Sequence, residues 1–103
     1  MIHLFANKVE VLNTTNAKGY KLAETNLNEI VLLQIDKGAE IPAHPLPVNV
    51  VFYVTKGKGE ITIEGNTFSA QKGDVVEVKA NVQRSWMNNT SESLELLVIK
   101  EKI

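Results

Sequence analysis

The apolar residues of this chain occur in short runs of about four to eight residues, and Gly, Pro or Asn bounds most of them. Many of the runs are rich in β-branched residues or alternate with polar ones, which is the pattern of β-strands. Strands are predicted at residues 8–12, 19–24, 29–36, 48–55, 59–64, 67–70, 74–78, 84–88 and 94–100. Helix is nearly absent from this pattern. We therefore expect an all-β sandwich or barrel, because both architectures limit the number of exposed strand edges.

Three short segments that contain glycine separate these predicted strands. They cover residues 56–59, 64–66 and 71–74. Glycine adopts positive φ angles at low energetic cost, so each segment is suited to a tight turn between neighbouring strands. These turns should fix which strands pair with each other.

All three prolines lie in the segment 41–47. Proline favours an extended conformation in the preceding residue and lacks a backbone donor, so this segment cannot be an ordinary central strand. Alternate side chains of an extended chain share one face. We therefore expect His44 and Leu46 to point the same way as Val50 and Phe52 in the strand that follows, forming an apolar wall with one histidine.

Composition excludes several classes of function. The chain has 103 residues, 11 basic and 12 acidic residues and a formal net charge of −1, which predicts one domain over residues 1–103. Such a balance provides no basic surface for nucleic acid or an anionic membrane. Cysteine is absent, and no apolar run approaches the ~20 residues that span a bilayer. We expect a cytoplasmic protein without disulfides.

The spacing of a few residues suggests a family. Five residues separate Gly38 from His44, and a later segment begins at Gly73 and ends at Asn88. With the Phe-Tyr-Val run and the glycines that follow it in 51–59, the chain resembles the small single-domain members of the cupin superfamily. The resemblance implies a double-stranded β-helix, also called a jelly-roll barrel.

The resemblance also implies a division of the chain. The barrel would cover about residues 29–100, and strands within residues 1–28 would flank it or lie at a dimer interface. Because an added N-terminal strand can pair with a partner's sheet, we expect a homodimer.

The metal site of this family is incomplete in the sequence. Cupin metal centres normally use three histidines and a glutamate, and only His44 occupies one of these positions. The other positions hold Leu46, Val50 and Arg84. Leucine and valine have no ligand atom, and arginine stays protonated and repels cations. The resemblance therefore implies a degenerate site, for which we expect neither a tightly bound metal nor any assigned catalytic residue.

Arg84 is the only arginine of the chain. At the mouth of a barrel, its guanidinium could bind a carboxylate or phosphate while an apolar wall holds the body of the ligand. The alternative is an arginine at the rim that pairs with Glu40, Asp74 or Glu77. The predicted ligand pocket consists of His44, Leu46, Val50, Phe52, Arg84 and Trp86.

Three functions remain open from the sequence. The first is metal-independent binding of a small molecule, with an anionic or carboxylate-bearing ligand in the barrel. The second is a metal-dependent enzyme of the dioxygenase, isomerase or lyase type, which would use a weakly bound divalent metal at His44 with non-standard ligands. The third is a structural or regulatory protein whose barrel interior is packed.

Overall fold

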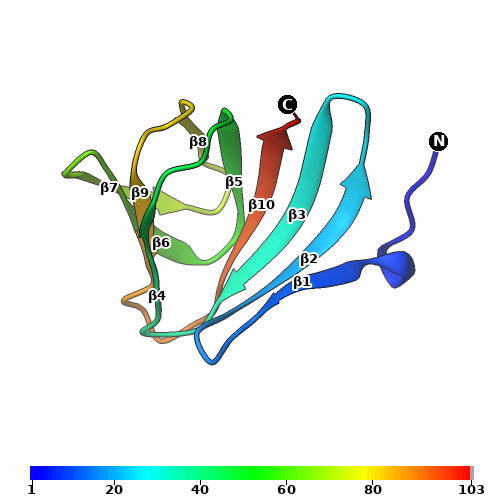
Figure 1. The fold of residues 1–103 in the computed structure, drawn as a ribbon. Coiled ribbons are helices and arrows are strands. Elements are labelled where there is room, and N and C mark those ends of the chain that lie inside the picture. The colour runs from blue at the N-terminus through cyan, green and yellow to red at the C-terminus, as the bar shows by residue number, and fades with distance from the viewer. Residues whose placement is uncertain (103) are drawn as a thin grey trace.

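A computed structural model describes residues 1–102 and shows two antiparallel β-sheets (Figure 1). The larger sheet has six strands in the order β1-β2-β3-β10-β5-β8, and the smaller has four in the order β4-β9-β6-β7. A short 3-10 helix, η1 (Phe5–Asn7), precedes the strands. The strands are β1 (Val9–Asn13), β2 (Ala17–Glu24), β3 (Asn28–Ile35), β4 (Glu40–His44), β5 (Val50–Lys56), β6 (Lys58–Ile63), β7 (Asn66–Gln71), β8 (Val75–Val78), β9 (Arg84–Met87) and β10 (Leu94–Glu101).

The predicted all-β architecture is confirmed, and each predicted strand is present with small shifts at its ends. The structure adds β4, which forms within the proline-containing segment and was not predicted as a strand. β4 lies at the edge of the smaller sheet and pairs with β9 only. An edge strand tolerates the missing donor of Pro42, because one side of it needs no partner.

The two N-terminal strands extend the larger sheet. β2 pairs with β3 along nearly its whole length, and β1 pairs with β2 at the edge (Figure 1). Both strands therefore lie beside the barrel strands of the same chain. No helix within residues 1–102 has the length and apolar character needed to cross a membrane.

The core lies between the two sheets and follows the predicted alternation. Val50, Phe52 and Val54 are buried, whereas Tyr53 between them is 39% exposed. The buried residues of β5 pack with those of β10 and of the smaller sheet, including Trp86. This alternation places every second side chain of β5 in the interior.

Gly57 shows why glycine is needed in the turn between β5 and β6. Its φ angle is +84°, which lies in the left-handed region. A Cβ atom at this position would lie 2.5 Å from the backbone oxygen of Ser93. Any other residue would combine backbone strain with a steric clash, so the predicted turn is confirmed here in detail.

Asn88 links the end of β9 to neighbouring loops. Its side chain is fully buried, and its Nδ2 donates to the carbonyl oxygens of Ile35, Asp36 and Glu92 at 3.1, 3.1 and 2.7 Å. Its Oδ1 accepts from the backbone N and the Oγ1 of Thr90 at 3.1 and 2.7 Å. The amide is thus held by donors and acceptors on both sides, which fixes the connection between the two sheets.

Candidate functional site

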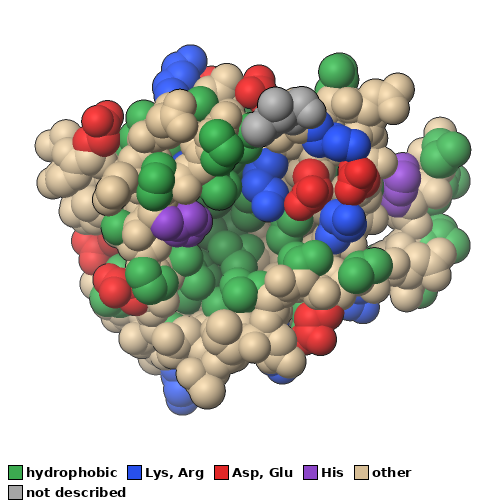
Figure 2. Space-filling view, in the orientation of Figure 1, with side chains coloured by type: hydrophobic (Ala, Val, Ile, Leu, Met, Phe, Trp, Pro, Cys, Tyr) green, Lys and Arg blue, Asp and Glu red, His purple; other side chains and the backbone are tan. Residues whose placement is uncertain are grey.

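A cavity of about 270 Å³ opens between the two sheets. Figure 2 shows a hollow on this face in which apolar side chains gather, with a histidine at its margin. Most of the wall is apolar and comes from strands of both sheets and from the segment after β4. These residues are Val11, Leu12, Val31, Leu33, Ile41, Leu46, Phe52, Trp86 and Val98. The polar side chains of the wall are those of Glu29, His44, Arg84, Ser85 and Lys100.

Arg84 and Trp86 share one face of β9. Residues of β9 alternate between buried and partly buried, and these two are the buried ones, each only 2% exposed. The guanidinium carbon of Arg84 lies 5.9 Å from the centroid of the Phe52 ring. Burial lowers the pKa of the guanidinium, but arginine remains protonated in proteins. A positive charge is therefore held inside the cavity wall.

The alternative prediction of an arginine at the rim is wrong. Among the described residues, Arg84 forms no ion pair, and Glu77 pairs with Lys79 instead. The reason is the alternation of side chains along β9. Arg84 lies two residues before the buried Trp86, so both side chains point to the interior. Arg84 lies in the interior despite its charge.

Two buried donors on residues that line this cavity lack a hydrogen-bond partner in the described part of the chain. Neither Nη1 of Arg84 nor Nε1 of Trp86 has a hydrogen-bond acceptor within residues 1–102. The indole packs edge-on against Phe52, with ring centroids 5.5 Å apart and an interplanar angle of 74°. Buried donors are normally satisfied, so each exception calls for an explanation.

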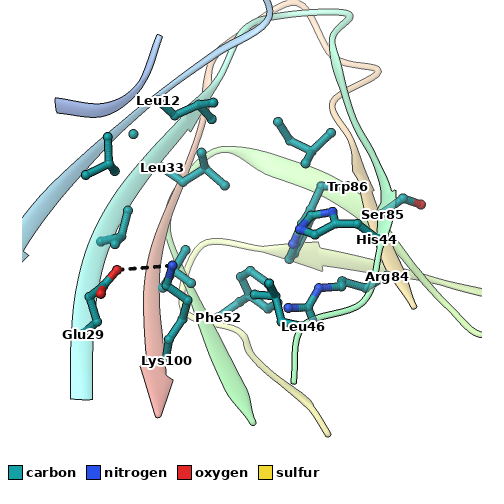
Figure 3. Close-up of a pocket in the computed structure, with 15 residues that line it drawn as sticks. Leu12, Glu29, Leu33, His44, Leu46, Phe52, Arg84, Ser85, Trp86 and Lys100 are labelled. Atoms are coloured by element: carbon teal, nitrogen blue, oxygen red, sulfur yellow. Dashed lines mark ion pairs between the residues drawn. The ribbon is translucent and has the colours of Figure 1, made fainter. Parts of the chain in front are cut away.

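His44 lies on β4 directly across from Arg84 on β9. Its side chain is exposed at the margin of the cavity, and its Nδ1 lies 3.0 Å from the carbonyl oxygen of Pro42. A carbonyl oxygen only accepts, so Nδ1 is the donor in this contact. Figure 3 shows the imidazole near the indole of Trp86, above the guanidinium of Arg84.

Glu29 and Lys100 form an ion pair on the wall of the larger sheet. They face each other on β3 and β10, and the Lys100 Nζ lies 3.3 Å from the Glu29 Oε1. Their side chains are 32% and 31% exposed (Figure 3). The sequence-based prediction did not include this pair. The signal was available, because Glu29 has the same parity along its strand as Val31 and Leu33, which also line the cavity.

The structure brings together five of the six predicted pocket residues. His44, Leu46, Phe52, Arg84 and Trp86 all line the cavity. Val50 does not, because it is fully buried in the core, as is its cross-strand partner Val78. The placement of Val50 in the pocket wall is therefore corrected: its side chain points inward, as predicted, but it belongs to the buried core cluster and does not line this cavity.

The donor set does not fit the metal centre that the fold resemblance implies. Within the described part of the chain, no three His, Cys, Asp or Glu side chains gather closely enough to hold an ion. His44 faces the Arg84 position across the strands, and a guanidinium repels a cation. A divalent ion needs several well-placed protein ligands, and the described residues do not supply them around His44.

Comparisons with known proteins agree with the observed fold. A family model described as a cupin domain matches residues 31–100. No curated protein sequence gives a match. An RmlC-like cupin from Shewanella frigidimarina has a similar structure with a TM-score of 0.85 and 19% identity, covering 97% of this chain and 88% of that chain.

Two further solved structures show the same arrangement of strands. KdgF from Halomonas sp. has a TM-score of 0.85 and 16% identity, covering 100% of this chain and 94% of that one. A predicted oxalate decarboxylase from Thermotoga maritima has a TM-score of 0.83 and 15% identity, and all of both chains is covered. Identities this low establish the fold alone. Since the family model spans most of the chain and these barrels superpose on it, the chain belongs to the cupin family, with a double-stranded β-helix fold.

Proposed function

We propose that this cupin binds a small carboxylate-bearing molecule in its cavity without a metal. The observation that carries the proposal is the pair of buried donors, Arg84 Nη1 and Trp86 Nε1, that have no acceptor among the described residues. A carboxylate has only acceptor oxygens and binds a guanidinium through two parallel hydrogen bonds. One bound carboxylate would supply the acceptors that these two donors lack among the described residues.

The charge balance of the cavity also favours an anion. Lys100 is neutralised by Glu29, whereas Arg84 has no acidic partner within residues 1–102. The charged side chains of the wall therefore leave one net positive charge, at Arg84. In an apolar environment this charge attracts a carboxylate more strongly than it would in water.

The other two functions have less support. A metal-dependent enzyme would need ligands that the described residues do not bring together around His44. Acid-base chemistry at His44 alone would need a positioned partner, and its described contact is with a backbone carbonyl. A packed barrel interior disagrees with a cavity of about 270 Å³ beside Arg84.

The test is calorimetric titration with straight-chain monocarboxylates from acetate to octanoate. We expect the wild type to bind the longer acids more tightly, because the added carbons bury against the apolar wall. Arg84→Met keeps a long side chain but removes the charge and the donors, and should weaken octanoate binding by about 100-fold. The matched control is Lys72→Met, which removes one positive charge from an exposed turn outside the cavity.

Equal octanoate affinity in the wild type and in Arg84→Met would contradict the proposal. Octanol provides a second control, because it has the same apolar body without the charge. If octanol binds as tightly as octanoate, the guanidinium does not recognise the carboxylate.

A further inference from the structure

We propose that Glu29 makes the cavity selective for monocarboxylates with an apolar body, by cancelling the charge of Lys100. This inference rests on the proposed function and adds a residue that determines specificity. It concerns the wall of the larger sheet, across the cavity from Arg84 (Figure 3).

The two cationic side chains of the cavity, Arg84 and Lys100, come from different sheets. Arg84 projects from β9 in the smaller sheet, and Lys100 lines the same cavity from β10 in the larger sheet. In Figure 3 the Lys100 side chain extends along the cavity wall toward Glu29, and the guanidinium of Arg84 lies on the other side of Phe52. The cavity thus has basic groups on two facing walls, and within residues 1–102 Lys100 has an acidic partner whereas Arg84 has none.

The ion pair decides how many carboxylates the cavity accepts. Two free cations on facing walls would suit a dicarboxylate, with one acid group at each. The Glu29 carboxylate pairs with the Lys100 ammonium at 3.3 Å. A second carboxylate of a ligand at this wall would therefore approach the negative charge of Glu29. Such an approach is unfavourable, and it is more so in a partly buried site.

The apolar part of the wall favours an apolar ligand body. Val31, Leu33, Phe52 and Val98 are among the apolar side chains that line the cavity. These side chains offer no hydrogen bond to a hydroxyl or a second acid, and burying a polar group without a partner is unfavourable. A hydrocarbon chain or an unsubstituted ring buries here without such a loss.

The size of the cavity sets the length of the ligand. An apolar cavity of about 150 Å³ holds one benzene molecule. A cavity of about 270 Å³ therefore accommodates roughly ten to a dozen non-hydrogen atoms. Octanoate is of this size, and suberate is the matching probe because it differs from octanoate by a second terminal carboxylate.

The experiment is a calorimetric titration of the wild type and of Glu29→Gln with octanoate and with suberate. The wild type should prefer octanoate by at least about tenfold. In Glu29→Gln the Lys100 ammonium is released, so suberate should bind at least about tenfold more tightly than to the wild type. Octanoate affinity should change less than about threefold.

Two further variants separate charge from local loosening. Glu24→Gln makes the same substitution at a glutamate that pairs with Lys21 and Lys102 outside the cavity wall, and should leave both affinities unchanged. Lys100→Gln opens the same ion pair but leaves Glu29 unneutralised, so suberate should bind no better than to the wild type. A gain of suberate affinity in both Glu29→Gln and Lys100→Gln would mean that the loosened wall, and not the charge, admits the diacid.

The outcomes distinguish this inference from the proposed function. If octanoate binds through Arg84 but suberate binds the wild type equally well, or gains nothing in Glu29→Gln, this inference is overturned and the proposed function stands. If octanoate fails to bind, or binds Arg84→Met as tightly as the wild type, the proposed function fails and the inference fails with it.

Discussion

Arg84 is the first residue of β9 and Asn88 follows its last, and both are buried polar residues. The Asn88 amide uses its donors and its acceptor fully, in contacts with the loops around it. Arg84, four residues earlier, has an Nη1 atom with no acceptor in the described part of the chain. The start of β9 thus carries a buried polar group that residues 1–102 leave without an acceptor, and the residue after its end carries one that the fold satisfies.

The difference indicates two separate roles. A buried polar group with all its hydrogen bonds stabilises one arrangement of the surrounding chain. A buried charge without a partner lowers stability, and such groups gather where a protein binds or reacts. We therefore propose that Asn88 stabilises the fold and that Arg84 serves ligand binding.

The largest expected effect is on stability, at the satisfied end of β9. Asn88→Ala leaves the buried carbonyl of Ile35 and neighbouring carbonyls without their donor, and should lower the free energy of unfolding by about 3 kcal/mol. Urea unfolding measures this change. Asn89→Ala is the matched control, because Asn89 is exposed and its amide donates to the carboxylate of Glu60 at the surface. A loss of less than about 1 kcal/mol in Asn88→Ala would break the comparison.

A smaller effect is expected from the second unpaired donor. Trp86→Phe keeps an aromatic ring in the core but removes Nε1, which has no acceptor within residues 1–102. If the indole donates to a bound carboxylate, octanoate affinity should fall about fivefold, or about 1 kcal/mol. Calorimetric titration provides the measurement. Unchanged octanoate affinity in Trp86→Phe would limit recognition of the acid to Arg84 alone.

The smallest expected effect is on the stability that Glu24 contributes, a charged residue at the exposed surface on β2. Hydrogen bonds from Lys102 and Lys21 lower the pKa of the Glu24 carboxyl from 4.5 to about 2. Because the folded-state pKa is depressed, Glu24 contributes stability above about pH 4.5, and this contribution is lost as the pH falls toward 2.

The measurement for Glu24 is the melting temperature of the wild type and Glu24→Gln across this pH range. The wild type should have the higher melting temperature near neutral pH, and the two proteins should converge near pH 2. The difference should be small because the group is exposed and screened by solvent. A constant difference at every pH would show that the carboxylate charge is not its cause.

The sequence was sufficient to predict the β-sheet content and the inward face of β5, because alternation is a local property of a strand. The same local reasoning did not predict β4, since three nearby prolines argued against a strand and only the sheet order shows that β4 is at an edge. Predicting an edge requires knowledge of which strands become neighbours in space.

The candidate site was predicted in part for similar reasons. Family spacing identified His44 and Arg84, but the expectation of a rim arginine followed the usual preference of charges for the surface. Glu29 and Lys100 were missed because they are distant in sequence, and only the pairing of β3 with β10 brings them together. Val50 was misplaced because parity specifies the side of a sheet that a residue faces but not how deeply it is covered.

The most direct test of the assignment of Arg84 is the free energy of unfolding of the wild type and Arg84→Met, each with and without octanoate. We predict that Arg84→Met without ligand is about 1–2 kcal/mol more stable than the wild type, because an unsatisfied buried charge has been removed. The wild type should gain about 2.7 kcal/mol when octanoate is at 100 times its Kd, whereas Arg84→Met, with a Kd about 100-fold higher, should gain only about 0.4 kcal/mol at that concentration. A variant that is less stable than the wild type and gains as much from octanoate would contradict the account.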